Sequence, residues 1–599
     1  MSSPTPAAAA SGMGTGIPYP NRWKALAVLV VSLVIVVLDN TVLNVALKTI
    51  QDDLGATQDQ LIWSINSYSL VFAALLFTWG VLGDRYGRRR ILMIGLTLFA
   101  LASALCAFAK TPEQLIAFRA LMGIGGASVL PVTLSIITVI FPPQERGKAI
   151  GAWAAAVGGA VALGPLLGGF LLEHPEWFNS LLGNNFGSVF LINVPIIIVG
   201  LIGIVKLVPE SKNPHPGRLD PLGLVLSVLG MLSLVYGIQE ASKAGWTAAS
   251  TFAFIIAGIV VLVGFVVYES RTDHPSLDLS LFQIRSFSVP LTGVSLAFAA
   301  LSGSLVFLAF YYQDVRGWSP LQSGALTLSF AVGQIIAAPR SAKMVARFGA
   351  RRVIPTGLIL ACIAMFLISQ IQVDSPVWYL LLFGFIFGTG LGNVIAPSTT
   401  RMTLATPPQR SGSGSAVQNT VRQLAAVLGV AILTSIEGTL YSNKIADRKI
   451  ADRLSGIPLP EQVKTALSDS VGATYYIAQS LQDKGTITAA QADALRQAGS
   501  DAFIPSLHVV AYISLAMLLI ALLVYILWLP AQAEAVSWHS GSSAASPVAA
   551  APGGRIEADG DPDALHQAHL VDEDPEHLAH IDDTPLEFGA AAKPSGEQV

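Results

Sequence analysis

A short charged stretch, Gly80-Val81-Leu82-Gly83-Asp84-Arg85-Tyr86-Gly87-Arg88-Arg89-Arg90, decides how this chain must fold. It separates two long apolar runs, residues 61–82 and 91–109. Four arginines in so short a link would be costly in hydrocarbon, so we expect the link to lie in water between two membrane-spanning helices. Because Lys and Arg accumulate on the cytoplasmic side of membrane proteins, the link also predicts which way the chain faces.

The composition is that of a protein with many membrane spans. The 599 residues are 53% hydrophobic and only 12% charged, whereas a soluble domain normally carries about twice that charged fraction. A bilayer core needs about 20 apolar residues per helix. Fourteen runs meet this need: 25–47, 61–82, 91–109, 114–140, 149–172, 188–208, 219–239, 251–269, 287–312, 320–340, 353–372, 377–399, 412–436 and 507–529.

The positions of the basic residues predict the orientation. Every second link between spans is basic, and these links hold Arg85, Arg88, Arg89, Arg90, Arg146, Lys148, Lys206, Lys212, Arg218, Arg271, Arg285, Lys343, Arg347, Arg351, Arg352, Arg401 and Arg410. The short links on the other side hold little beyond Lys48, Lys110, Lys243 and Arg316. The basic links are therefore expected in the cytoplasm, and an even number of spans places both termini there.

An internal repeat divides the chain. Residues 342–352 are a second, weaker copy of the opening stretch, in which Gly349 stands for Gly87 and Ala346 replaces Asp84. Eight expected helices separate the copies, which predicts two six-helix halves with one inserted pair. The expected parts are a disordered cytoplasmic N-terminus (1–21), the first half (22–210), the inserted pair (211–285), the second half (286–529, with an external segment at 441–505) and a disordered acidic cytoplasmic tail (530–599).

The opening stretch has the pattern Gly-x-Leu-x-Asp-Arg-x-Gly-Arg-Arg, which resembles the signature between helices 2 and 3 of the major facilitator superfamily. An ordinary basic loop would need neither the glycine spacing nor the aspartate. The layout of fourteen helices is similar to that of the drug:proton antiporters of this superfamily. The resemblance implies an all-α major facilitator fold and an inner gate formed by Gly80, Asp84, Arg85, Gly87 and Arg88. It also implies that Asp84 braces span 2 against the start of span 13, residues 411–414, when the transporter faces outward.

Two ionisable residues inside apolar runs are candidates for proton coupling. Asp39 lies in Leu38-Asp39-Asn40-Thr41 of span 1, similar to the first-helix signature of the fourteen-helix family except for Lys48, where proline is usual. Arg119 begins a stretch of span 4 that resembles the superfamily motif in which an arginine is linked to proton transfer. Ionisable residues at membrane depth are usually functional. The alternatives are an aspartate that caps a neighbouring helix and an arginine that reaches the lipid headgroups.

Span 5 carries a glycine-rich pattern with one proline. Gly159, Gly164, Pro165, Gly168 and Gly169 include the order Gly-Pro-x-x-Gly-Gly, which resembles the motif of exporters and antiporters in this superfamily. Small residues let helix backbones touch, and proline removes one backbone hydrogen bond and bends the helix. The pattern favours export over uptake. Residues 190–195, at the start of span 6, and residues 415–423, in span 13, also match the family.

The sequence contains no nucleotide-binding loop, no Ser/His/Asp set and no metal cluster, so we expect neither an enzyme nor a cofactor or bound metal. The expected function is proton-coupled efflux of small amphipathic compounds by a monomer in the cell membrane. Its partners would be protons, membrane lipids and the substrate, with no nucleic acid. The residues expected to line the substrate site are Trp63, Tyr68, Tyr311, Tyr312, Gln313, Asn393, Gln418 and Asn419. Alternatives are a dedicated exporter or importer of one metabolite, siderophore or lipid, and a non-transporting membrane sensor.

Overall fold

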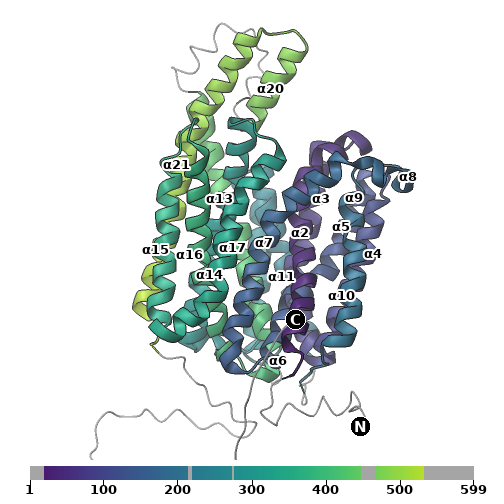
Figure 1. Ribbon diagram of the computed structural model, residues 1–599, viewed down its shortest axis with the longest axis vertical. Coiled ribbons are helices and arrows are strands. Elements are labelled where there is room, and N and C mark those ends of the chain that lie inside the picture. The colour runs from purple at the N-terminus through teal and green to yellow at the C-terminus, as the bar shows by residue number, and fades with distance from the viewer. Residues whose placement is uncertain (1–18, 214–218, 273–274, 447–466, 468–469, 532–599) are drawn as a thin grey trace, which may run out of the picture. The chain divides into compact units, whose positions relative to one another are not determined.

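The computed structural model of the chain describes residues 19–213, 219–272, 275–446, 467 and 470–531. All regular elements in these residues are helical (Figure 1). They are α2 (Arg22–Leu54), α3 (Gln58–Tyr86), α4 (Arg88–Ala107), α5 (Pro112–Gly126), α6 (Val129–Ile140), α7 (Pro143–Glu173), η2 (Pro175–Trp177), α8 (Asn179–Leu182), α9 (Ser188–Leu191), α10 (Asn193–Leu207), α11 (Pro221–Ala244), α12 (Ala249–Glu269), η3 (Leu279–Gln283), α13 (Arg285–Phe310), η4 (Tyr311–Val315), α14 (Pro320–Phe348), α15 (Ala350–Ile368), α16 (Val377–Ala405), η5 (Pro408–Arg410), α17 (Ser411–Ile445), α20 (Val471–Asp483) and α21 (Ala489–Trp528). The disorder predicted for the N-terminus and the acidic tail concerns residues that lie almost entirely outside these ranges.

The number of spans agrees with the sequence analysis. In the described part of the chain, thirteen helices are long and apolar enough to cross a membrane, and α7 supplies a fourteenth when its two segments are counted together. These segments, Pro143–Val161 and Leu166–Glu173, meet at an angle of 41°. The bend lies between Val161 and Leu166, a stretch that includes Pro165, and proline cannot complete the backbone hydrogen bonding of a helix. The all-α fold with fourteen spans is therefore confirmed.

Two spans that the sequence predicts as continuous each contain a short break in the regular helix, at residues 127–128 and at residue 192, but run on as single apolar helices. Span 4 consists of α5 and α6, and span 6 consists of α9 and α10. Pro131 and Pro195 lie just after these breaks, and a proline ring clashes with the carbonyl group four residues earlier. The carbonyl groups affected are those of Ala127 and Leu191, which lie at the two breaks.

The contacts between helices form two main groups. Helices α2 to α10 contact one another, as do α13 to α21; we call these groups the N-terminal and C-terminal halves. Helices α11 and α12 pack against each other, and α11 contacts both α3 and α17. The halves meet mainly through α7 with α14 and α3 with α17. In Figure 1, α7 and α14 accordingly lie between the outer helices α15 and α21 on one side and α4 and α10 on the other.

The helices on either side of the external segment are longer than the sequence predicts. Helix α17 continues to Ile445, and α21 begins at Ala489, well before the predicted start of span 14 at residue 507. A helix of 40 residues is about 60 Å long, twice the thickness of a bilayer core. Helix α20 packs against α21, and residues 447–466 of the external segment lie outside the described ranges. We call the opposite end of the bundle, which carries the two motif copies at residues 80–90 and 342–352, the basic end.

Candidate functional site

Asp39 of α2 and Arg119 of α5 form a buried ion pair. Arg119 Nη1 lies 2.5 Å from Asp39 Oδ2. Arg119 is 0% exposed and Asp39 is 2% exposed. The guanidinium group also donates through Nε to the Ser64 carbonyl at 3.1 Å and lies over the Tyr68 ring, 4.4 Å from its centroid. Arg119 therefore points into the N-terminal half, which excludes the alternative that it reaches toward the lipid headgroups.

An amide completes the surroundings of this carboxylate. Asn193, the first residue of α10, donates through Nδ2 to Asp39 Oδ1 at 3.0 Å and to Ser103 Oγ at 3.1 Å. Asn193 Oδ1 and Arg119 Nη2 are buried and have no hydrogen-bond partner in the described residues. Asn193 lies in the stretch 190–195 that resembles the family, but no role was expected for it; its signal in the sequence is a polar amide two residues before Pro195 in an apolar span.

This arrangement places one titratable carboxylate beside a fixed positive charge inside the bundle. The Asp39 carboxylate is balanced by one guanidinium group and one amide, so its charge is compensated without water. Both carboxylate oxygens accept a hydrogen bond, so the surroundings of Asp39 depend on Arg119 and Asn193 staying in place. In the part of the chain that the structure describes, no group of three or more His, Cys, Asp or Glu residues is placed to hold a metal ion.

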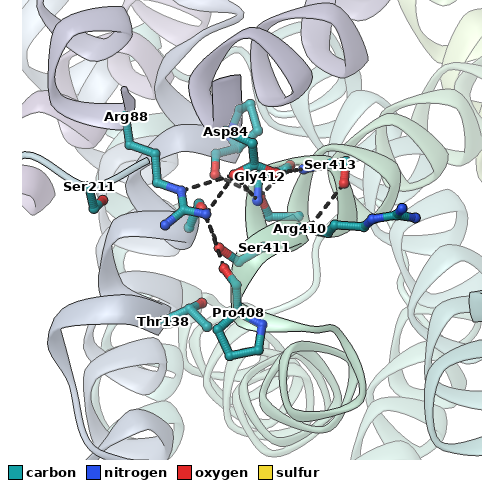
Figure 2. A network of polar contacts seen from close by, with 12 residues as sticks. Asp84, Arg88, Thr138, Ser211, Pro408, Arg410, Ser411, Gly412 and Ser413 are labelled. Atoms are coloured by element: carbon teal, nitrogen blue, oxygen red, sulfur yellow. Dashed lines mark hydrogen bonds and ion pairs between the residues drawn. The ribbon is translucent and has the colours of Figure 1, made fainter. Parts of the chain in front are cut away.

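At the basic end, Asp84 joins α3 to the first turn of α17. The Gly412 and Ser413 N–H groups donate to Asp84 Oδ1 at 2.8 Å and Oδ2 at 2.9 Å. Arg88 donates to Oδ1 through Nε at 3.0 Å and Nη2 at 2.7 Å, and Nη2 also donates to the Pro408 carbonyl at 3.1 Å. Figure 2 shows the carboxylate between Arg88 and the start of α17. The contact that the family resemblance implies is therefore present; we call it the Asp84 latch.

The backbones of α3 and α17 touch beside the latch. A methyl group at Gly80 would overlap the Ala416 side chain and the Gly412 carbonyl. Gly87 has φ +108°, a backbone conformation that favours glycine, and it separates α3 from α4. The Arg85 guanidinium lies over the Tyr86 ring, 5.7 Å from its centroid. Hence two of the five predicted gate residues, Asp84 and Arg88, make the polar contact to α17, and Gly80 allows the close approach.

The second motif copy makes a contact of a different kind. Helix α14 packs on α7, where a methyl group at Gly151 would lie 2.6 Å from the Ala338 carbonyl and one at Gly147 would lie 3.1 Å from Ala342 Cβ. Ala346, which stands in the place of Asp84, is exposed and carries no hydrogen-bonding side chain. An acid latch therefore forms on only one of the two equivalent interfaces.

The glycine-rich pattern of α7 lies against the helix that holds Asp39. A methyl group at Gly164 would overlap the Thr41 side chain, and one at Gly168 would lie 3.1 Å from Val42 Cγ1. Thr41 follows Asp39 by two residues on α2. Other glycines of the pattern face α14: methyl groups at Gly159 and Gly169 would be in ordinary contact with Ile335 and Leu321. Helix α7 thus contacts both the proton-coupling candidate and the C-terminal half.

The eight residues predicted to line a substrate site do not come together. Tyr68 belongs to the surroundings of Arg119, and Trp63 packs on Tyr236 of α11 with ring centroids 5.7 Å apart. Asn393 donates to the Thr389 carbonyl at 3.0 Å within α16.

The three predicted residues of η4 lie at the end of α13 away from the basic end. Tyr311 donates its hydroxyl to the Gln372 carbonyl at 2.7 Å, Tyr312 packs on Trp318, and Gln313 is exposed. A buried tyrosine usually finds a partner for its hydroxyl, and Tyr311 finds it in a backbone carbonyl rather than in a substrate site.

Gln418 and Asn419 do lie on the side of α17 that faces the N-terminal half. Earlier turns of the same side contact α6: Ser411 Oγ lies 2.7 Å from Ser135 Oγ, and Ser415 Oγ donates to the Pro131 carbonyl at 2.7 Å. Asn419 donates to the Ser415 carbonyl at 2.8 Å, and Gln418 Oε1 has no partner in the described residues. Of the predicted set, these two residues are placed best to meet a substrate between the halves.

Comparison with known proteins assigns the chain to a family of transporters. The family model described as Major Facilitator Superfamily matches residues 29–430. The chain is 36% identical over 500 residues to the multidrug efflux pump LfrA of Mycolicibacterium smegmatis, covering 83% of this chain and 95% of that protein. It is 33% identical to the methyl viologen resistance protein SmvA of Salmonella typhimurium, covering 84% and 97%.

A solved structure shares the fold. A bacterial homologue of the human lysosomal transporter Spinster, in an inward-facing and unoccupied conformation, superposes with a TM-score of 0.52 at 18% identity, covering 85% of this chain and 98% of that one. The helical architecture, the two motif copies and the family match agree, and the chain belongs to the major facilitator superfamily.

Proposed function

We propose that this protein exports small amphipathic compounds across the cell membrane in exchange for protons. The observation that carries the proposal is the buried pair of Asp39 and Arg119, a titratable carboxylate within the membrane part of a carrier. The names of the relatives support the choice of cargo, since LfrA is a multidrug efflux pump and SmvA confers resistance to methyl viologen. The glycine-rich pattern of α7 supports export rather than uptake.

The proton step follows from the charges around Asp39. When Asp39 binds a proton, its attraction to Arg119 is lost, and the guanidinium group keeps only the Ser64 carbonyl and the Tyr68 ring. When Asp39 releases the proton, the ion pair forms again. The two protonation states therefore favour different positions of α2 and α5, which is what coupling of a proton to a conformational change requires.

Transport would proceed by rocking of the two halves around a site near the middle of the membrane, which opens the site to one side at a time. In this structure α3 and α17 are joined at the basic end by the Asp84 latch. If the basic links face the cytoplasm, as their charge predicts, this is the conformation closed toward the inside. Substrate would enter from the cytoplasm only after the latch opens.

The experiment is substrate-driven proton release. Purified protein in liposomes with a trapped pH indicator is given a dye substrate, and the Asp39→Asn variant is compared with Asp52→Asn, an exposed aspartate of the same helix. Asp39→Asn should abolish proton release while the protein remains folded and inserted, and Asp52→Asn should behave as the unaltered protein. Normal proton release from Asp39→Asn would contradict the proposal.

A further inference from the structure

Arg422 is a basic residue at mid-depth of α17 that neither the proton step nor the latch uses. It lies eleven residues after Ser411, the first residue of the helix. At 1.5 Å per residue this is about 16 Å along the helix, near the middle of a bilayer core about 30 Å thick. The side chain is not at the lipid surface, because the residue is only 5% exposed.

Arg422 lies where the two halves meet. It shares a side of α17 with Ser411 and Ser415, whose hydroxyl groups contact α6 of the N-terminal half. Its guanidinium carbon is 5.7 Å from the centroid of the Trp153 ring of α7. On the C-terminal side it is 5.4 Å from the Phe298 ring of α13. Aromatic faces from both halves thus flank one positive charge.

In the described part of the chain, no carboxylate balances this charge. Nε donates to the Gln418 carbonyl at 3.3 Å, Nη2 donates to Asn419 Oδ1, and no Asp or Glu oxygen lies within 4 Å among the residues that the structure describes. Two other buried arginines of the bundle, Arg88 and Arg119, each hold an aspartate. A guanidinium group stays protonated under all physiological conditions. Arg422 is therefore a fixed positive charge held by neutral groups at the interface of the halves.

We infer that Arg422 binds the anionic group of the exported compound, and that aromatic weak acids are a preferred substrate class; this rests on the export function proposed above. The planar guanidinium group matches a carboxylate or a delocalised phenolate with two parallel hydrogen bonds. Trp153 and Phe298 supply flat apolar surface for the ring that carries the acid. Gln418 Oε1, buried one turn away and without a partner among the described residues, is an acceptor for a hydroxyl or amide of the same compound.

Two dyes with one ring system test the assignment. Fluorescein and rhodamine 6G share a xanthene core, but at pH 8 the first is an anion and the second a cation. Equilibrium binding of each dye to the purified full-length protein is measured for the unaltered protein, for Arg422→Gln and for Arg340→Gln. Arg340 is an exposed arginine of α14 and serves as the matched control.

The inference expects fluorescein to bind the unaltered protein and to lose at least about tenfold in affinity in Arg422→Gln. Rhodamine 6G affinity should change less than about twofold or improve, because a repelling charge has been removed. Arg340→Gln should alter neither dye. If Arg422→Gln does not insert stably, Arg422→Lys decides: it keeps the charge but loses the paired donors, so only the affinity for fluorescein should fall.

Three results would overturn the inference. They are unaltered fluorescein affinity in the Arg422 variants, equal loss of both dyes in an inserted variant, and a protein that binds rhodamine 6G but not fluorescein. The last result, combined with proton release driven by rhodamine 6G, would leave the proposed export function standing. A protein that binds fluorescein through Arg422 but releases no proton with either dye would instead contradict the proton coupling and keep the anion site.

Discussion

Substitution of Asp84 by Asn tests whether the latch sets the balance between the two conformations. The carboxylate accepts the N–H groups of Gly412 and Ser413, the first unpaired donors of α17. The ion pair between Asp84 and Arg88 joins the end of α3 to the start of α4. Both helices belong to the N-terminal half, so this pair can persist when the two halves separate. The conformational balance therefore depends on the two bonds to α17, together with the bond from Arg88 Nη2 to the Pro408 carbonyl, and hardly on the Asp84–Arg88 ion pair itself.

The size of the effect follows from these bonds. An Asn side chain keeps one acceptor oxygen, presents an NH₂ group to the second N–H group, and removes the negative charge from the start of α17. A charge at a helix N-terminus contributes about 0.3–1 kcal/mol, and up to ~2 kcal/mol when partly buried. With one hydrogen bond also lost, we expect a change of about 1–2 kcal/mol, which moves a two-state balance roughly 5- to 30-fold toward the conformation open at the basic end.

Pulsed electron–electron distance measurements can count the two populations. Spin labels at Arg90 and Gln409, both exposed and on opposite sides of the latch, report the separation of α4 from the start of α17. The native Cys106 and Cys362 are buried, which favours selective labelling. The control is Asp278→Asn, which removes the charge that pairs with Arg410, leaves an amide oxygen that can still accept from Ser280, and should change the ratio little. A distance distribution that Asp84→Asn leaves unaltered would refute the latch.

Two further substitutions probe the packing of α3 and α7. Gly80→Ala should separate α3 from α17 and reduce transport several-fold, because its methyl group has no space against the α17 backbone. Gly83→Ala, where the nearest atom is in ordinary contact at 3.4 Å, should be tolerated; equal transport by the two variants would show that the close approach is unimportant. Pro165→Ala should straighten α7 and impair substrate-driven proton exchange more than substrate binding, as measured by dye-induced pH change and equilibrium binding. Exchange at the unaltered rate would remove the argument that this bend serves antiport.

Features that depend on one helix at a time can be predicted from the sequence. Span number and fold follow from apolar length and the distribution of basic residues, which act on each helix alone. The breaks in spans 4 and 6 were not predicted, although Pro131 and Pro195 are visible in the sequence. A proline inside a membrane helix either bends it or breaks it, and the neighbouring helices decide which outcome is the more stable.

The pairing of buried charges depends on helices far apart in the sequence. Asp39 and Arg119 are 80 residues apart, and Asp84 and Gly412 are 328 apart. Each of these residues could be singled out from an apolar or charged pattern. Their proximity could be expected only for the latch, where the resemblance to a family supplied the partner. Nothing in the sequence distinguishes Arg422, which has no acidic partner, from Arg119, which has one.

Most of the predicted substrate residues lie apart from one another, and this has a geometric cause. Successive residues of a helix turn by about 100°, so an aromatic or amide side chain chosen by type alone faces the other half of the molecule only by chance. For α17 a stronger signal was present: Ser411, Ser415, Gln418 and Arg422 recur every three or four residues on one side of the helix. A polar stripe of this kind in a membrane helix must face protein or water rather than lipid. This stripe begins beside the latch contacts of Gly412 and Ser413 and ends at Arg422. A substrate anion bound by Arg422 and the Asp84 latch at the basic end therefore both act on helix α17.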